Sequence, residues 1–144
     1  MRVKIKFPDQ IPLIQLEIPV RIGDINYGGH LGNDAVLSIL HEARMQALAT
    51  QGFTELSAGG HGLIMADVMI AYRGEAFYGD TLLVTIFTDE LSDKTFDLLY
   101  QVQALRNGAK EEIAHAKTGM VCFDYSIRKV TTMSLILKTW LKGD

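Results

Sequence analysis

Residues 21–44 of this 144-residue chain read RIGDINYGGHLGNDAVLSILHEAR, and they hold its most informative pattern. A polar, glycine-rich segment over 23–33 runs without a break into good helix formers. These formers extend over 34–52, with Asn and Asp at the start, no internal proline or glycine, and glycine at the end, so they predict one long helix. Apolar residues occur on nearly all sides of this helix, which favours burial by an element that wraps around it.

The rest of the chain supplies strands for that wrapping. One strand is predicted before the helix, over 13–22, and four after it, over 62–72, 80–91, 95–105 and 111–125. Within 95–105, apolar residues alternate (Phe96, Leu98, Tyr100, Val102 and Ala104), which is typical of an antiparallel strand with one buried face. Turn residues at 92–94 and 106–108 join consecutive strands. The order predicts one α+β domain over 1–144, with a curved antiparallel sheet of about five strands around a central helix and a short amphipathic helix at 133–141.

Composition excludes several classes of protein. The net charge is −3, which argues against a general nucleic-acid binder. No apolar run is long enough for a membrane helix, and the first residues lack the apolar core of a signal peptide. Cys122 is the only cysteine, so no intrachain disulfide forms, and its apolar strand predicts an inert core thiol. We therefore expect a cytoplasmic protein.

Residues 21–44 resemble the thioesterase branch of the hot-dog superfamily, which includes the 4-hydroxybenzoyl-CoA thioesterases. Its members often carry Asp-x-Asp-x-x-Gly-His-Val-Asn-Asn before a helix that ends near Glu-x-Arg. The matching residues here are Asp24, Asn26, Gly29, His30, Asn33, Glu42 and Arg44. Residues 70–80, IAYRGEAFYGD, resemble the family's second-strand pattern, with Glu75 about where its proline lies, and residues 123–129 resemble its closing strand. The resemblance implies a hot-dog fold and hydrolysis of acyl-CoA or acyl-carrier-protein thioesters.

The helix start suits this chemistry. Attack on a thioester carbonyl creates an oxyanion, which backbone N–H groups at a helix N-terminus stabilise. We expect the N–H groups around residues 31–33 to bind the carbonyl, and Asn26 and His30 to orient water or substrate. The expected substrate-binding residues are Gly29, Leu31, Asn33, Tyr72 and Arg73. Asn33 is also expected to cap the helix.

The identity of the catalytic base is open, because Asn26 stands where many relatives have an acid and an amide does not accept a proton at neutral pH. Asp24, Glu42 and Asp67 are the candidate substitutes. We expect burial in the apolar helix to raise the pKa of Glu42, and Asp67 shares an apolar strand face with Met65 and Met69. Structural roles compete with these: a turn for Asp24 and Asn26, an ion pair with Arg21 for Glu42, and a satisfied buried carboxylate for Asp67.

Two other functions compete with hydrolysis. Asn26 favours a non-catalytic hot-dog module that binds acyl thioesters, and a hot-dog dehydratase or hydratase ranks last because its own His and acid pair is absent. We expect no metal, since the histidines lack ligand spacing, and no cofactor apart from the coenzyme A in the substrate. The resemblance implies a homodimer, or a tetramer of two dimers, with sites built from both subunits. The candidate cations for the coenzyme A phosphates are Arg73, Lys94, Lys117, Arg128 and Lys129.

Overall fold

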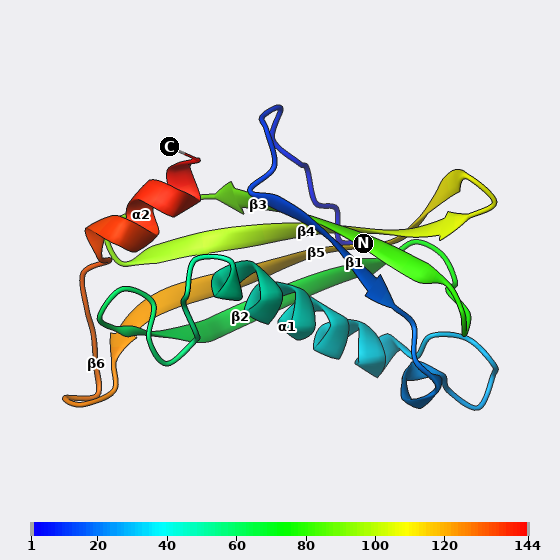
Figure 1. Cartoon of the computed structure of the whole chain (residues 1–144), viewed down its shortest axis with the longest axis horizontal. Coiled ribbons are helices and arrows are strands. Elements are labelled where there is room, and N and C mark those ends of the chain that lie inside the picture. The colour runs from blue at the N-terminus through cyan, green and yellow to red at the C-terminus, as the bar shows by residue number, and fades with distance from the viewer. Residues whose placement is uncertain (1, 144) are drawn as a thin grey trace.

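A computed structural model describes residues 2–143 and consists of one antiparallel sheet with a long helix along one face (Figure 1). The sheet order is β1-β3-β4-β5-β2, with β6 added to β5. Its strands are β1 (Ile14–Pro19), β2 (Gly62–Tyr72), β3 (Thr81–Asp89), β4 (Thr95–Arg106), β5 (Ala109–Asp124) and β6 (Lys129–Val130). The helices are a short 3-10 turn, Ile22–Asp24, then α1 (Asn33–Ala49) and α2 (Leu135–Lys142).

The predicted elements all appear, with bounds shifted by a few residues. The 62–72 strand is confirmed at both ends as β2. The predicted helix ends earlier than expected, at Ala49, because residues 50–52 form a turn that closes at Gly52, where φ is +73°. Asn107 and Gly108 both have positive φ, 50° and 77°, and form the tight β4–β5 hairpin. The sixth strand, β6, was missed because two residues carry no periodic pattern.

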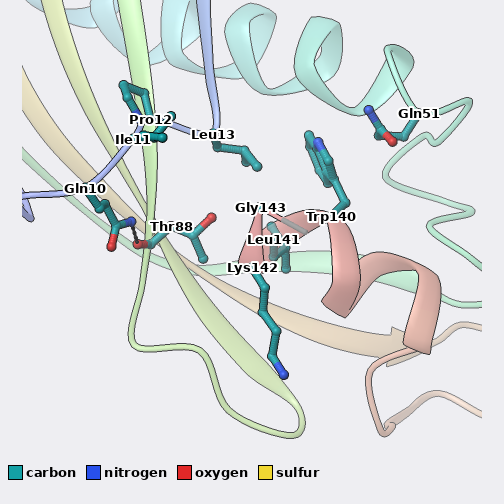
Figure 2. Close-up of a pocket in the computed structure, with 10 residues that line it drawn as sticks. All are labelled: Gln10, Ile11, Pro12, Leu13, Gln51, Thr88, Trp140, Leu141, Lys142 and Gly143. Atoms are coloured by element: carbon teal, nitrogen blue, oxygen red, sulfur yellow. Dashed lines mark hydrogen bonds between the residues drawn. The ribbon is translucent and has the colours of Figure 1, made fainter.

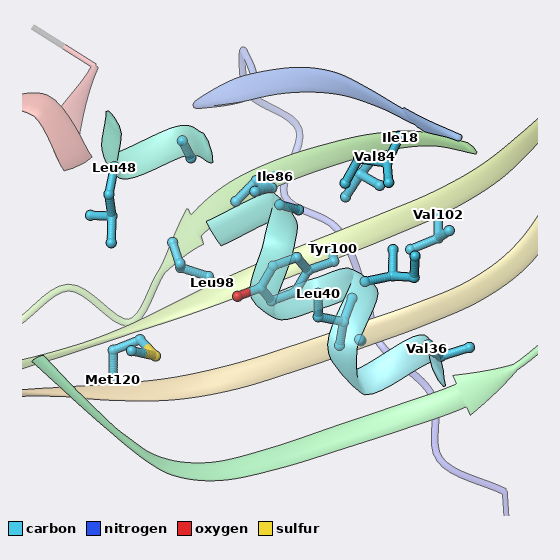
Figure 3. Close-up of a cluster of buried hydrophobic side chains, with 14 of the residues drawn as sticks. Ile18, Val36, Leu40, Leu48, Val84, Ile86, Leu98, Tyr100, Val102 and Met120 are labelled. Atoms are coloured by element: carbon cyan, nitrogen blue, oxygen red, sulfur yellow. The ribbon is translucent and has the colours of Figure 1, made fainter. Parts of the chain in front are cut away.

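The core lies between α1 and the sheet. Figure 3 shows Leu40 of α1 beside Tyr100 of β4, and both are fully buried. The five alternating residues expected on the inner face of β4 are all buried, which confirms the predicted register. The expectation that α1 is covered on most sides is wrong for the single chain. Its outer face, with Leu37, Ser38, His41 and Glu42, is exposed, because the sheet contacts only one face.

Helix α2 closes the end of the core near the C-terminus of α1. The Ser134 side chain accepts the N–H of Leu137 at 3.2 Å and caps α2. A cavity of about 570 Å³ separates α2 from residues 10–13, with Trp140 on one side and the Gln10–Thr88 hydrogen bond on the other (Figure 2). Within residues 2–143, no helix has the length and apolarity needed to cross a membrane.

Candidate active site

The loop before α1 is a tight turn organised by Asn26. The Asn26 amide oxygen accepts the N–H of Gly28 at 2.8 Å, and its backbone N–H donates to the His30 carbonyl at 2.9 Å. Gly29 has φ of +84°, a conformation that suits glycine. Asn26 therefore shapes the loop that presents His30, in agreement with the turn role that competed with catalysis.

His30 carries a proton acceptor. Its Nδ1 lies 3.1 Å from the carbonyl oxygen of Leu31. A carbonyl only accepts hydrogen bonds, so Nδ1 is the protonated nitrogen, and Nε2 of the neutral ring keeps its lone pair. The ring is half-buried, and among residues 2–143 no partner forms a hydrogen bond with its Nε2.

The free N–H donors lie further along the chain than predicted. The Leu31 N–H donates to the Ala76 carbonyl at 2.7 Å, and the Gly32 N–H donates to the Asp24 carbonyl at 3.0 Å. Between residues 2 and 143, the N–H groups of Asn33, Asp34 and Ala35 have no acceptor. The free donors are thus at 33–35 and, of the predicted 31–33, only Asn33 is among them; all three lie within the first turn of α1, where the helix dipole favours negative charge.

Asn33 does not cap α1, which corrects the prediction. The N-cap is Gly32, which makes no side-chain bond, and Asn33 is the first helical residue. The Asn33 carbonyl instead accepts the hydroxyl of Tyr72 at 3.0 Å, which ties the helix start to the end of β2.

A cavity of about 260 Å³ lies at this helix start. Four residues predicted from the sequence line it, namely His30, Leu31, Asn33 and Tyr72. Glu75 lines it too and was not predicted as a functional residue. The sequence offered one signal for Glu75, namely that it lies about where the related thioesterases carry a proline.

The backbone around Glu75 is firmly held, although its side chain is exposed. Gly74 fits against the Glu112 carbonyl, where an added Cβ would come within 2.6 Å of the oxygen. The Glu75 carbonyl accepts Arg106 Nη2 at 2.6 Å, and Arg106 is itself paired with Asp80 at 2.7 Å. Hydrogen bonding to Arg106 holds the pKa of Asp80 below its usual value, so this pair is charged at neutral pH. The loop thus holds Glu75 at the cavity through a fixed backbone.

Asp24 has a structural environment. It is buried, and its carboxylate accepts the Arg21 backbone N–H at 2.9 Å and the Arg21 guanidinium at 3.3 Å. It does not line the cavity at the helix start. Its backbone carbonyl nevertheless matters, because it accepts the Gly32 N–H and so fixes the entry into α1.

The expected burial of Glu42 and Asp67 is wrong. Glu42 lies on the outer face of α1 and accepts a hydrogen bond from Gln46 at 2.7 Å. The Asp67 side chain is 62% exposed and pairs with Lys117 at 2.8 Å, and hydrogen bonding to that lysine lowers the pKa of Asp67. A bulge between Met65 and Asp67 shifts the strand by one residue and places Asp67 on the outer face. Neither carboxylate lines the cavity in the single chain.

Comparison with known proteins identifies the family of the chain. Residues 20–141 match the model of the thioesterase-like superfamily. The chain belongs to this superfamily. It is 29% identical over 127 residues to a 1,4-dihydroxy-2-naphthoyl-CoA hydrolase of Rippkaea orientalis, covering 86% of this chain and 91% of that protein. A protein of the same name from Crocosphaera subtropica is 27% identical, covering 87% of this chain and 93% of its own length.

Solved thioesterase structures share the fold. A 1,4-dihydroxy-2-naphthoyl-CoA thioesterase from Synechocystis superposes with a TM-score of 0.78 at 22% identity, covering 89% of this chain and 94% of its own. A thioesterase-like protein from Pseudomonas aeruginosa gives 0.80 at 20% identity, covering 89% and 97%. The predicted hot-dog fold is confirmed, and so is the prediction of a thioesterase.

Proposed function

We propose that this thioesterase hydrolyses acyl-CoA thioesters in the cavity at the start of α1. The observation that carries the proposal is that His30, Glu75 and Asn33, the first residue of α1, line one cavity at this helix start. The N–H groups bind the carbonyl oxygen and stabilise the oxyanion that forms when water attacks. Collapse of that intermediate breaks the C–S bond and releases a carboxylic acid and the thiol of coenzyme A.

A proton acceptor must take one proton from the attacking water and return it to the leaving sulfur. Two groups at the cavity are suited to this, the Glu75 carboxylate and His30 Nε2, and the Asn26 amide is not. We assign the proton transfer to Glu75, because a carboxylate there replaces the acid that Asn26 lacks. His30 then orients the water or the thioester through its Nε2.

A second cavity, of about 720 Å³, supports coenzyme A as the thiol carrier. It contains three cations, Arg2, Lys4 and Arg73, in a chain whose net charge is negative. Tyr72 lines both this cavity and the one at the helix start, so the two are neighbours. If the phosphates of coenzyme A bind among these cations, its pantetheine arm can extend past Tyr72, which lines both cavities. Of the five cations named from the sequence, only Arg73 belongs to this group.

We further propose that the protein is a homodimer joined along β2. This strand is eleven residues long and lies at an edge of the sheet, with only β5 beside it. Long edge strands with apolar side chains are sites for pairing with another chain, and β2 exposes Met69 and Tyr72. Both cavities contain β2 residues, so a partner paired there would complete their walls.

The experiment for the hydrolase is a thiol-release assay with a panel of acyl-CoA substrates. The panel contains aliphatic acyl-CoAs of several lengths, benzoyl-CoA and 1,4-dihydroxy-2-naphthoyl-CoA, the substrate in the names of the curated relatives. Release of free coenzyme A with saturation kinetics is the expected result. If no substrate of the panel were hydrolysed and coenzyme A did not bind, the proposal would be wrong.

The non-catalytic alternative has its own signature. Acyl-CoA would then raise the melting temperature without turnover, and Asn26→Asp would restore hydrolysis to an inactive protein. An aspartate at 26 still accepts the Gly28 N–H, so this variant keeps the loop.

The dimer is tested by light scattering after gel filtration, where Met69→Glu should yield the monomer mass. A monomeric wild-type protein would contradict the β2 interface.

A further inference from the structure

The cavity of about 570 Å³ between α2 and residues 10–13 takes no part in the hydrolysis proposed above. It shares no lining residue with the cavity at the start of α1. Its walls come from residues 10–13, the turn after α1, the end of β3 and the last turn of α2. The volume lies within the usual range for small-molecule sites, about 300–1,000 Å³.

Thr88 of β3 brings an unpaired hydroxyl to this cavity. The residue is only 9% exposed, and its Oγ1 is buried without a hydrogen-bond partner among residues 2–143. Figure 2 shows the Thr88 side chain pointing from β3 toward α2, on the side of the cavity opposite Trp140. Buried hydroxyl groups are normally paired, because leaving one unpaired is destabilising. Thr88 therefore points to a ligand that carries a hydrogen-bonding group.

Trp140 of α2 forms the opposite wall. Its ring lies 6.1 Å from the ring of Phe53 at an interplanar angle of 73°, and this edge contact with a buried residue holds the indole in place. The indole is nevertheless only partly buried. A firmly held, partly exposed indole offers a flat surface on which a planar ring can stack.

The charges around the cavity favour an uncharged ligand. No Asp or Glu within residues 2–143 lines it, so a cation would have no counter-charge. Lys142 is its only charged lining residue, and Figure 2 shows that side chain extending away from both Thr88 and Trp140. The Gln51 amide, also at the wall, donates from Nε2 to Thr50 Oγ1 at 3.1 Å, which leaves its carbonyl oxygen to accept a hydrogen bond from a ligand.

We propose that this cavity binds an uncharged planar nitrogen heterocycle of the purine type. Such a ring stacks on Trp140, donates an N–H to the Gln51 carbonyl oxygen and accepts the Thr88 hydroxyl at a ring nitrogen. A saturated apolar chain could fill the same volume but would leave the Thr88 hydroxyl unpaired. The site is additional to thioester hydrolysis and does not depend on it.

Trp140 is the only tryptophan of the chain, so its fluorescence reports on this cavity. Adenosine, an uncharged purine nucleoside, should quench that fluorescence in a saturable manner, with excitation where adenosine does not absorb. It should also raise the melting temperature of the protein, because it binds the folded state. Octanoate, an apolar anion, should do neither. No response to adenosine up to its solubility limit, or a response to octanoate alone, overturns the proposal.

Thr88→Val distinguishes a ligand site from a structural role. The variant should bind adenosine about tenfold more weakly, because one hydrogen bond to the ring is lost. The melting temperature of the ligand-free variant should equal or exceed that of wild type, since an unpaired buried hydroxyl is removed. A lower melting temperature with unchanged affinity for adenosine would show that the hydroxyl is structural, and would overturn the proposal.

Thr85→Val is the matched control on the same strand. Thr85 is also buried but lies on the opposite face of β3, and its hydroxyl accepts Gln15 Nε2 at 2.9 Å. Its replacement should lower the melting temperature and leave the affinity for adenosine unchanged. Trp140→Leu, measured by calorimetry because the fluorophore is gone, should bind adenosine at least about tenfold more weakly through the loss of stacking.

Coenzyme A also contains a purine, and two further titrations identify the source of the ligand. Quenching of Trp140 by coenzyme A, weakened in Thr88→Val to the same degree as quenching by adenosine, would assign the cavity to the adenine of coenzyme A. Quenching by adenosine alone would assign it to a separate base or nucleoside. Both outcomes support a purine site, and neither measurement requires turnover, so a failure of the hydrolase would be seen separately.

Discussion

The Leu31 N–H donates to the carbonyl of Ala76 at 2.7 Å, and this bond joins the loop before α1 to the loop after β2. It uses the Leu31 N–H, which the sequence analysis had assigned to the substrate, so the N–H groups that stay free lie in the first turn of α1. It also fixes Glu75, the residue before Ala76, at the cavity that His30 lines. One backbone contact thus determines both which donors are free and which carboxylate is near them.

Replacing Glu75 by Gln should reduce kcat for the best acyl-CoA by at least about 100-fold, because the amide cannot take the proton from water. The change keeps the size of the side chain, which is exposed, so the free energy of unfolding should stay within about 0.5 kcal/mol of wild type. Steady-state kinetics and urea unfolding measure the two effects.

Glu17→Gln is the matched control for Glu75→Gln. Glu17 is also exposed but lies on β1, at the opposite edge of the sheet from β2, and its replacement should leave kcat unchanged. A fully active Glu75→Gln protein would remove Glu75 from the mechanism and leave His30 as the proton acceptor.

The sequence predicted the elements well because local patterns determine them. The alternation over 95–105 fixed the inner face of β4, and the uninterrupted helix formers marked α1. His30 and Asn33, which line the cavity at the helix start, belong to a contiguous motif. Glu75, Arg2 and Lys4 were not predicted, because their roles depend on which loops and strands lie side by side. That pairing is not encoded in any short stretch.

The errors over Asp67 and Glu42 have distinct physical causes. Asp67 shares the parity of Met65 along the strand, but the bulge between them reverses the faces from that point on. Glu42 was expected to be buried because α1 has apolar residues on many sides, and such a helix gives only a weak indication of which face is inward. In both cases the side chain is a carboxylic acid that faces outward and is exposed.

Charge reversal at Arg73 should weaken the binding of coenzyme A thioesters selectively. Arg73→Glu is expected to raise KM for acyl-CoA about tenfold, since one favourable phosphate contact becomes repulsive. KM for the same acyl group on N-acetylcysteamine, which lacks the nucleotide, should not change. High salt should narrow the difference for acyl-CoA, because these cations are exposed.

Lys129→Glu serves as the comparison for Arg73→Glu, since Lys129 is an exposed cation on β6, away from the cavity that contains Tyr72 and Arg73. It should leave KM for both thioesters unchanged. If Arg73→Glu raised KM equally for acyl-CoA and for the N-acetylcysteamine thioester, Arg73 would act on the shape of the cavity and not on the phosphates.

Cys122 should be unreactive in the folded protein. It is fully buried on β5, and burial raises the pKa of its thiol to about 11. At about pH 8 only about 0.1% of such a thiol is ionised, and the thiolate is the reactive form. A disulfide reagent should therefore label no thiol in the native protein and one per chain in urea. Rapid native labelling would mean that β5 opens readily. Because Cys122 should not react with the reagent, it should add little background signal to the thiol-release assay.

The ion pair of Asp80 with Arg106 should make stability depend on pH in a defined direction. The Asp80 carboxylate accepts Arg106 Nη2 at 2.7 Å and the Phe77 N–H at 2.8 Å, and both partners of the ion pair are largely buried. Its folded-state pKa lies below the ordinary 3.8, mainly through hydrogen bonding to Arg106. The stabilisation is therefore complete above pH 3.8 and is lost as the pH falls through the lower folded-state pKa.

Asp80→Asn should accordingly lower the free energy of unfolding by about 2 kcal/mol at about pH 7, and by clearly less at about pH 2.5. Urea unfolding of the wild type and the variant at the two pH values measures this difference in the free energy of unfolding. Asp93→Asn is the control, since the Asp93 side chain is 85% exposed and its 3.4 Å pair with Lys138 should contribute little at either pH. Because Arg106 also donates to the Glu75 carbonyl, Asp80→Asn should lower kcat at neutral pH as well. If wild type and Asp80→Asn differed in free energy of unfolding by the same amount at both pH values, the contacts of Asp80 would not depend on its charge.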